Sequence, residues 1–105
     1  MINESQTRTI EKIREYLKSK EGIQKLVKFE IHTHDMSPSY HYQRPFTLVQ
    51  IFAEMNVPKE QRKNPFLEDS YHFTIGNNGG IINATLQHFG RRTKSIKKHI
   101  RIMVR

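Results

Sequence analysis

Two histidines and an aspartate lie close together in the stretch His32-Thr33-His34-Asp35. An H-x-H spacing at a strand end presents two imidazoles to one metal ion in several hydrolase families. Those families take further His and Asp ligands from other strands of a scaffold much larger than 105 residues. The remaining histidines show no helical i, i+4 pair and no Glu-x-x-His pattern: they are His41, His72, His88 and His99. We therefore predict neither a metal site nor a cofactor.

Motifs for nucleophilic catalysis and for nucleotide binding are also absent from the sequence. No G-x-S-x-G elbow occurs. The stretch Gly76-Asn77-Asn78-Gly79-Gly80 resembles a phosphate cradle, but no Lys-Ser/Thr pair follows it, so it predicts a turn. We predict a protein that is not an enzyme. A small ribonuclease toxin, which needs only a few His, Arg and Lys residues, stays open as an alternative.

The positive charge of the chain is concentrated near its C-terminus. The net charge is +8, and all ten acidic residues lie before residue 70, whereas residues 70–105 hold seven Lys and Arg. Such an acid-free basic segment favours a polyanionic partner, and nucleic acid is the first candidate. The predicted phosphate-binding residues are Arg91, Arg92, Lys94, Lys97, Lys98 and Arg101.

Aromatic residues supply the second ingredient of single-strand binding, because bases stack on rings without regard to sequence. Tyr40 and Tyr42 lie in a polar stretch with Arg44 close by. We predict that these three residues complete the nucleic-acid site. Phe89, near Arg91, is a weaker candidate.

Elements that position these residues can be predicted from the spacing of apolar side chains. Residues 5–20 show a helical stripe of Ile10, Ile13 and Leu17, with Gly22 beyond the end as a C-cap. Residues 25–33 alternate as a half-buried strand, and residues 34–44 show no period and predict an exposed loop.

The stretch from Arg44 to Met55 predicts a second helix. Thr47 and Gln50 have the spacing of a capping box, and Phe46 before the cap is placed for a hydrophobic staple. Apolar residues then recur at i, i+3, i+4 and i+7 over 48–55.

The rest of the chain predicts one more helix and a hairpin. Asn64-Pro65 favours a helix start, with the helix over 65–76. Residues 81–89 fit either a helix or a strand, and we favour the strand; residues 96–104 alternate as a strand with a cationic outer face. The resulting prediction is one α+β domain over 1–105, with an N-terminal helix over 1–22. Residues 44–104 form its winged helix-turn-helix-like core, with a C-terminal basic β-hairpin at 81–104 as the wing.

The stretch from Arg44 to Phe52 and the turn Gly90-Arg91-Arg92-Thr93-Lys94-Ser95 together give a family resemblance. They resemble the FTLxxLF and GKTS pattern of a small single-stranded-DNA-binding protein family, a winged-helix-like domain of formerly unknown function carried by staphylococcal cassette chromosome elements. The resemblance covers about residues 44–102. It implies a winged-helix-like fold, single-stranded DNA binding and a part in replication of a mobile genetic element, beside the helicase or primase of that element.

The sequence thus predicts non-enzymatic, largely sequence-independent binding of single-stranded DNA. Two further alternatives remain: a duplex-DNA-binding winged-helix regulator, and a small mobile-element or phage inhibitor that binds a protein partner. The absence of cysteine favours a reducing compartment, and no stretch has the length and apolar character of a membrane span or a secretory signal. A cytoplasmic location is therefore expected, whereas the oligomeric state is not predicted.

Overall fold

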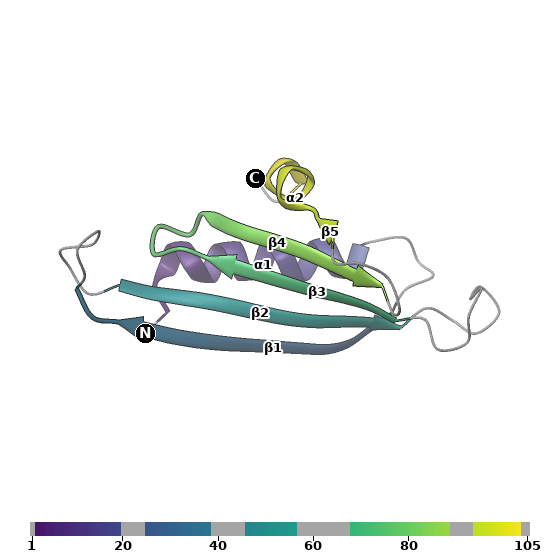
Figure 1. The fold of residues 1–105 in the computed structure, drawn as a ribbon, viewed down its shortest axis with the longest axis horizontal. Coiled ribbons are helices and arrows are strands. Elements are labelled where there is room, and N and C mark those ends of the chain that lie inside the picture. Colours follow the sequence, from purple (N-terminus) through teal and green to yellow (C-terminus); the bar gives the residue numbers. More distant parts are fainter. Residues whose placement is uncertain (1, 20–24, 39–45, 57–67, 89–93, 104–105) are drawn as a thin grey trace.

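The protein is built around one antiparallel sheet. A computed structural model describes residues 2–19, 25–38, 46–56, 68–88 and 94–103. Its five strands pair in chain order, with α1 along one face of the sheet and α2 beside β4 (Figure 1). The elements are α1 (Glu4–Ser19), β1 (Lys25–Met36), β2 (Phe46–Asn56), β3 (Glu68–Ile75), β4 (Ile81–His88), β5 (Lys94–Ser95) and α2 (Lys97–Met103).

The predicted winged helix-turn-helix is wrong. The predicted second helix is strand β2, the predicted recognition helix is strand β3, and the second strand of the predicted wing is helix α2. The α+β class holds only in a sheet-dominated form. The predicted helix at 5–20, turn at 76–80 and strand at 81–89 are confirmed, apart from end residues. The predicted strand at 25–33 is confirmed too, but it continues to Met36, so the loop predicted from residue 34 is wrong over 34–36. The predicted helix start at Asn64-Pro65 lies outside the described residues.

Helix α1 begins with a reciprocal cap. The Asn3 side chain accepts a hydrogen bond from the Gln6 main-chain N–H at 2.8 Å, and the Gln6 side chain accepts one from the Asn3 N–H at 3.1 Å. This pair satisfies two of the donors that a helix start leaves unpaired. The predicted stripe of Ile10, Ile13 and Leu17 is buried against the sheet. The chain therefore does contain a capping box, but it is at Asn3, not at Thr47.

Strand β2 shows why the helical interpretation failed. Its odd-numbered residues are all buried on the face toward α1: Thr47, Val49, Ile51, Ala53 and Met55. Alternating β-branched residues with a neighbouring Phe favour a strand. Leu48 and Phe52 lie on the opposite face. Together with Ile51 and Met55 they have the sequence spacing of a helical stripe, but in the strand the four side chains do not share a face. Strand β3 alternates in the same way, with Tyr71, Phe73 and Ile75 buried.

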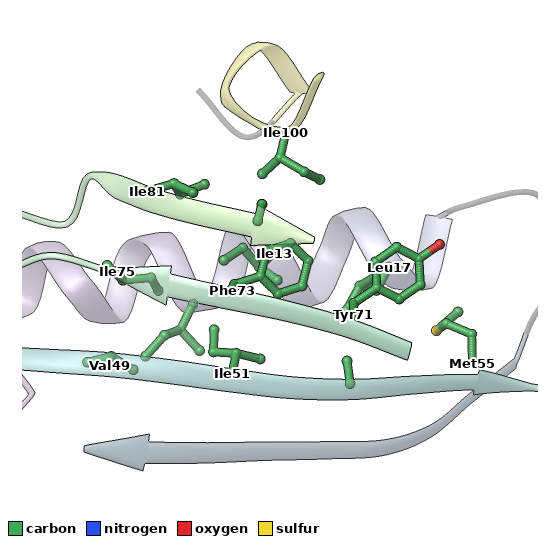
Figure 2. Close-up of a cluster of buried hydrophobic side chains, with 13 residues drawn as sticks. Ile13, Leu17, Val49, Ile51, Met55, Tyr71, Phe73, Ile75, Ile81 and Ile100 are labelled. Carbon is green, nitrogen blue, oxygen red and sulfur yellow. The ribbon is translucent and has the colours of Figure 1, made fainter. Parts of the chain in front are cut away.

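The hydrophobic core lies between α1 and the inner face of β2, β3 and β4. In Figure 2, α1 runs behind the sheet, and its Ile13 and Leu17 lie in the same cluster as Tyr71 and Phe73. The two aromatic rings are nearly parallel, with centroids 6.1 Å apart. Full burial of each large side chain contributes about 1.5–3 kcal/mol, so this layer supplies most of the stabilisation of the fold.

Helix α2 extends this core beyond the sheet edge. The Ile96 N–H donates to the Ala84 carbonyl at 2.9 Å, and the Ile100 N–H donates to the Ile96 carbonyl at 2.9 Å. Ile100 is fully buried and points toward β4 (Figure 2). The four-residue spacing of these isoleucines prevails over the alternation that predicted a strand. Neither α1 nor α2 combines the length and apolarity that a membrane-crossing helix needs.

Candidate nucleic-acid interface

The predicted site residues fall into two groups. Lys94, Lys97, Lys98 and Arg101 are described by the structure and lie in β5 and α2. The others lie outside the described residues and stay predictions: Tyr40, Tyr42, Arg44, Arg91 and Arg92. The weaker aromatic candidate, Phe89, is outside them too. The site can therefore be built only around the four described cations.

Three of these cations meet at one pocket between α1, β4, β5 and α2. We call it the basic pocket; its volume is about 760 Å³. Its rim carries Lys94, Lys97 and Lys98, and none of the described residues that line it is acidic. The other lining residues are Tyr16, Tyr71, Leu86, Ser95, Ile96 and His99. The pocket thus combines an apolar and aromatic lining with a cationic rim.

Local pairing of the chain produces this arrangement. Strand β5 is only two residues long and pairs Leu86 with Lys94 and Thr85 with Ser95. The buried Ile100 then holds α2 against β4. Because the strand and the helix follow each other within a few residues, the three lysines are presented around one opening. Lys94 and Lys98 are exposed and Lys97 is half-buried.

Tyr16 contributes a half-buried ring to the basic pocket, from α1. Its hydroxyl lies 3.2 Å from His99 Nε2, a hydrogen-bonding distance that links α1 to α2. The two rings meet edge to face with centroids 6.0 Å apart. Burial raises the pKa of the Tyr16 hydroxyl above its ordinary value, because the phenolate is poorly solvated there. The ring therefore presents a neutral aromatic surface to whatever enters the pocket.

Arg101 has a different role from the three lysines. Its Nε and Nη2 both donate to the main-chain carbonyl of Ile81, at 3.1 and 2.9 Å. This fork ties the last turn of α2 to the first residue of β4. Arg101 does not line the basic pocket.

A second cluster lies on the sheet face opposite α1, which we call the open face. Phe52 of β2 contacts the His72 ring edge to face at 4.5 Å between centroids, and the His32 ring at 5.1 Å. These rings line a hollow of about 410 Å³ that also contains Lys28, Glu30 and Glu54.

Charges of both signs neutralise one another on the open face. Lys28 Nζ lies 3.3 Å from Glu30 and 3.8 Å from Glu54. Hydrogen bonds from His32 and Lys28 lower the pKa of the Glu30 carboxyl. Unlike the basic pocket, this cluster offers no excess of cations.

The H-x-H motif does not form a ligand set. The His32 ring is hydrogen-bonded to Glu30 at 3.1 Å, and the His34 ring to Gln50 at 2.9 Å. The Asp35 carboxylate accepts from the Thr47 hydroxyl at 2.8 Å on the other face of the sheet. Within the described ranges, no group of three His, Cys, Asp or Glu side chains is placed to hold a metal ion.

Sequence reasoning missed the aromatic partner of the lysines. Tyr16 flanks the buried stripe of α1 and is 78 positions before Lys94 in the sequence, so only the tertiary fold brings them together. One usable signal was its place beside Leu17, at the border between the buried and exposed sides of the helix.

Comparisons with protein-family models, with curated proteins and with solved structures found no match to this chain.

Proposed function

We propose that the protein binds single-stranded DNA without strong sequence preference and without catalysis, at the basic pocket. The observation that carries this proposal is the meeting of Lys94, Lys97 and Lys98 around the partly exposed ring of Tyr16. No carboxylate among the described lining residues opposes a phosphate there. The net charge of +8 acts in the same direction at longer range.

The pocket suits a flexible strand better than a duplex. An unpaired base can enter it and stack on Tyr16, whereas a paired base keeps its faces inside the helix stack. Each lysine ammonium neutralises a phosphate as a point charge and reads no base. The predicted recognition helix of a duplex-binding regulator is strand β3, so that alternative loses its structural basis.

A salt series of fluorescence anisotropy with matched single-stranded and duplex oligonucleotides tests the proposal. Tighter binding of the single strand is expected, with a slope of log K against log salt near −2 for three phosphate contacts. Equal or tighter binding of the duplex would contradict it.

Two double variants with the same loss of charge locate the site. Lys94→Ala with Lys98→Ala removes two exposed cations from the pocket rim, and should make the slope shallower by about 1.4. Arg8→Ala with Lys18→Ala removes two exposed cations of α1 that do not line the pocket, and should leave the slope unchanged. Equal effects of the two pairs would show that total charge, not the pocket, determines binding.

A protein-binding inhibitor is the second candidate, and the open face favours it. An aromatic ring among charges of both signs, as around Phe52, suits a protein surface better than a phosphate backbone. This candidate predicts weak DNA binding at physiological salt. The role in mobile-element replication and the helicase or primase partner stay predictions from the sequence resemblance.

A further inference from the structure

Strand β1 forms one edge of the sheet and is long. It runs over twelve residues from Lys25 to Met36, and only β2 pairs with it among the described strands. Apolar side chains along it are open to solvent: Val27 is 60% exposed, Ile31 38% and Met36 41%. A long sheet edge that faces no other described strand and carries exposed apolar side chains is a template for another strand.

Near Ile31, β1 carries an acidic and a basic residue at positions that are complementary to their own reverse. If two copies pair antiparallel with Ile31 opposite Ile31, then Glu30 of each copy lies opposite His32 of the other. Both residues are on the open face, where the Glu30 carboxylate already accepts from His32 Nε2 within one chain at 3.1 Å. Two copies would therefore form a square of two carboxylates and two imidazoles in which unlike groups are adjacent.

The same register also joins the apolar residues. Ile31 belongs to the face toward α1, because it pairs with the buried Ile51. Two opposed isoleucines on that face have Cβ atoms about 4.5–5.5 Å apart, close enough to cover one another.

A shift of the centre to residue 30 or 32 would instead oppose two glutamates or two histidines. A centre at Phe29 would also oppose unlike groups, Lys28 and Glu30. However, the β-bulge between Leu26 and Lys28 lies next to that centre and interrupts the pairing. The unlike pairs and the regular stretch of β1 together favour the register centred on Ile31.

We propose that β1 is an interaction surface for a second copy of this chain, paired antiparallel about a two-fold axis at Ile31. The axis stands perpendicular to the sheet, so the two sheets join into one and both open faces lie on the same side. Main-chain hydrogen bonds supply the affinity, and the Glu30 and His32 pairs favour this register.

Charge variants with a mixing step test the proposal. Glu30→Lys places a lysine opposite His32, and His32→Glu places two glutamates opposite one another. Each variant alone should raise the dimer dissociation constant about tenfold in sedimentation velocity. An equimolar mixture of the two restores unlike pairs, so native mass spectrometry with one variant isotopically labelled should show mainly heterodimers.

Gln87→Lys is the matched control, because it changes an exposed residue of the open face on β4, away from the β1 edge. It should leave the dissociation constant unchanged. Thermal unfolding of each variant separates loss of pairing from loss of fold. A wild-type protein that stays monomeric from ~1 µM to ~1 mM overturns the proposal. A dimer whose dissociation constant is unchanged in both single variants also overturns it. So does a mixture of the two variants that associates no more tightly than either variant alone.

Discussion

The side-chain amide of Gln6 donates a hydrogen bond to the main-chain carbonyl of Thr47, with 2.7 Å between Nε2 and O. The same amide also donates to the Gly76 carbonyl at 3.0 Å. Gln6 is fully buried, and its side-chain oxygen accepts the Asn3 N–H. One side chain therefore caps α1 and joins the helix to β2 and to the end of β3.

Replacing Gln6 with Leu should lower the free energy of unfolding by about 3 kcal/mol. Two hydrogen bonds to buried main-chain carbonyls are lost, each worth about 0.5–1.5 kcal/mol, and the lost cap adds about 1 kcal/mol. The Gly76 carbonyl keeps its hydrogen bond from the Gly79 N–H at 3.0 Å, so it is not left unsatisfied. Urea denaturation followed by circular dichroism measures the change. Glu11→Ala, at an exposed position of the same helix, should change stability by less than about 0.5 kcal/mol. Equal stabilities of the two variants would show that the Gln6 contacts do not anchor α1.

In the turn between β3 and β4, a Gly→Ala substitution should cost more stability at Gly79 than at the neighbouring Gly80. Gly79 has a φ of +83°, and a Cβ there would lie 2.7 Å from the main-chain oxygen of Ser5 on α1. At Gly80 a Cβ would meet only the Asn78 side chain, at 3.0 Å. In thermal unfolding, Gly79→Ala should cost about 2 kcal/mol or more and Gly80→Ala clearly less, since only the former combines strain with a main-chain clash. The reverse order would contradict this packing of the turn.

The local sequence predicted α1 and β4, but not how β2 and β3 fold. Helix α1 carries its own cap and an unambiguous stripe, so local signals suffice there. In β2, Leu48, Ile51, Phe52 and Met55 satisfy a helical period, while the odd-numbered residues satisfy a strand period. Pairing of β2 with strands on both sides decides between the two, and this pairing is a tertiary property.

The candidate site was predicted only in its charges. The absence of acidic residues after position 69 pointed to Lys94, Lys97 and Lys98, which the fold does bring together. Their ring partner comes from the other end of the chain, and the alternation of 96–104 suggested a strand in place of α2. Composition thus indicated the kind of partner, while the aromatic contact depended on the packing of α1 against α2.

Docking of α2 should depend on one of its isoleucines and not on the other. Ile100 is fully buried, whereas Ile102 is 72% exposed two positions later. Ile100→Ala should lower the free energy of unfolding by about 2–4 kcal/mol through the lost burial and the cavity, and Ile102→Ala by less than about 0.5 kcal/mol. Urea denaturation compares them. Similar values would mean that α2 contributes little to the core.

Stability should fall at high pH through Tyr16. Its folded-state pKa is raised above the unfolded value of 10.0 by burial, so its contribution is complete below that pH. As the pH rises from 10.0 through the folded pKa, the unfolded chain loses the proton first and the contribution is lost. Urea denaturation at several pH values should show a steeper loss for the wild type than for Tyr16→Phe. Parallel curves would show that this hydroxyl is not linked to folding.

Two substitutions of Tyr16 separate its ring from its hydroxyl in DNA binding. If a base stacks on the ring, Tyr16→Phe should keep nearly all the affinity for a single-stranded oligonucleotide, although it loses the contact with His99. Tyr16→Leu should weaken binding about tenfold, because a stacked base contributes about 1–3 kcal/mol. Fluorescence anisotropy at two salt concentrations measures both affinities, and the salt slope should be the same in the wild type and both variants because no phosphate contact is removed.

Equal losses of affinity in the two variants would assign the effect to the hydroxyl and its bond to α2. Unchanged affinity in Tyr16→Leu would leave the lysines as the only part of the pocket that contacts DNA.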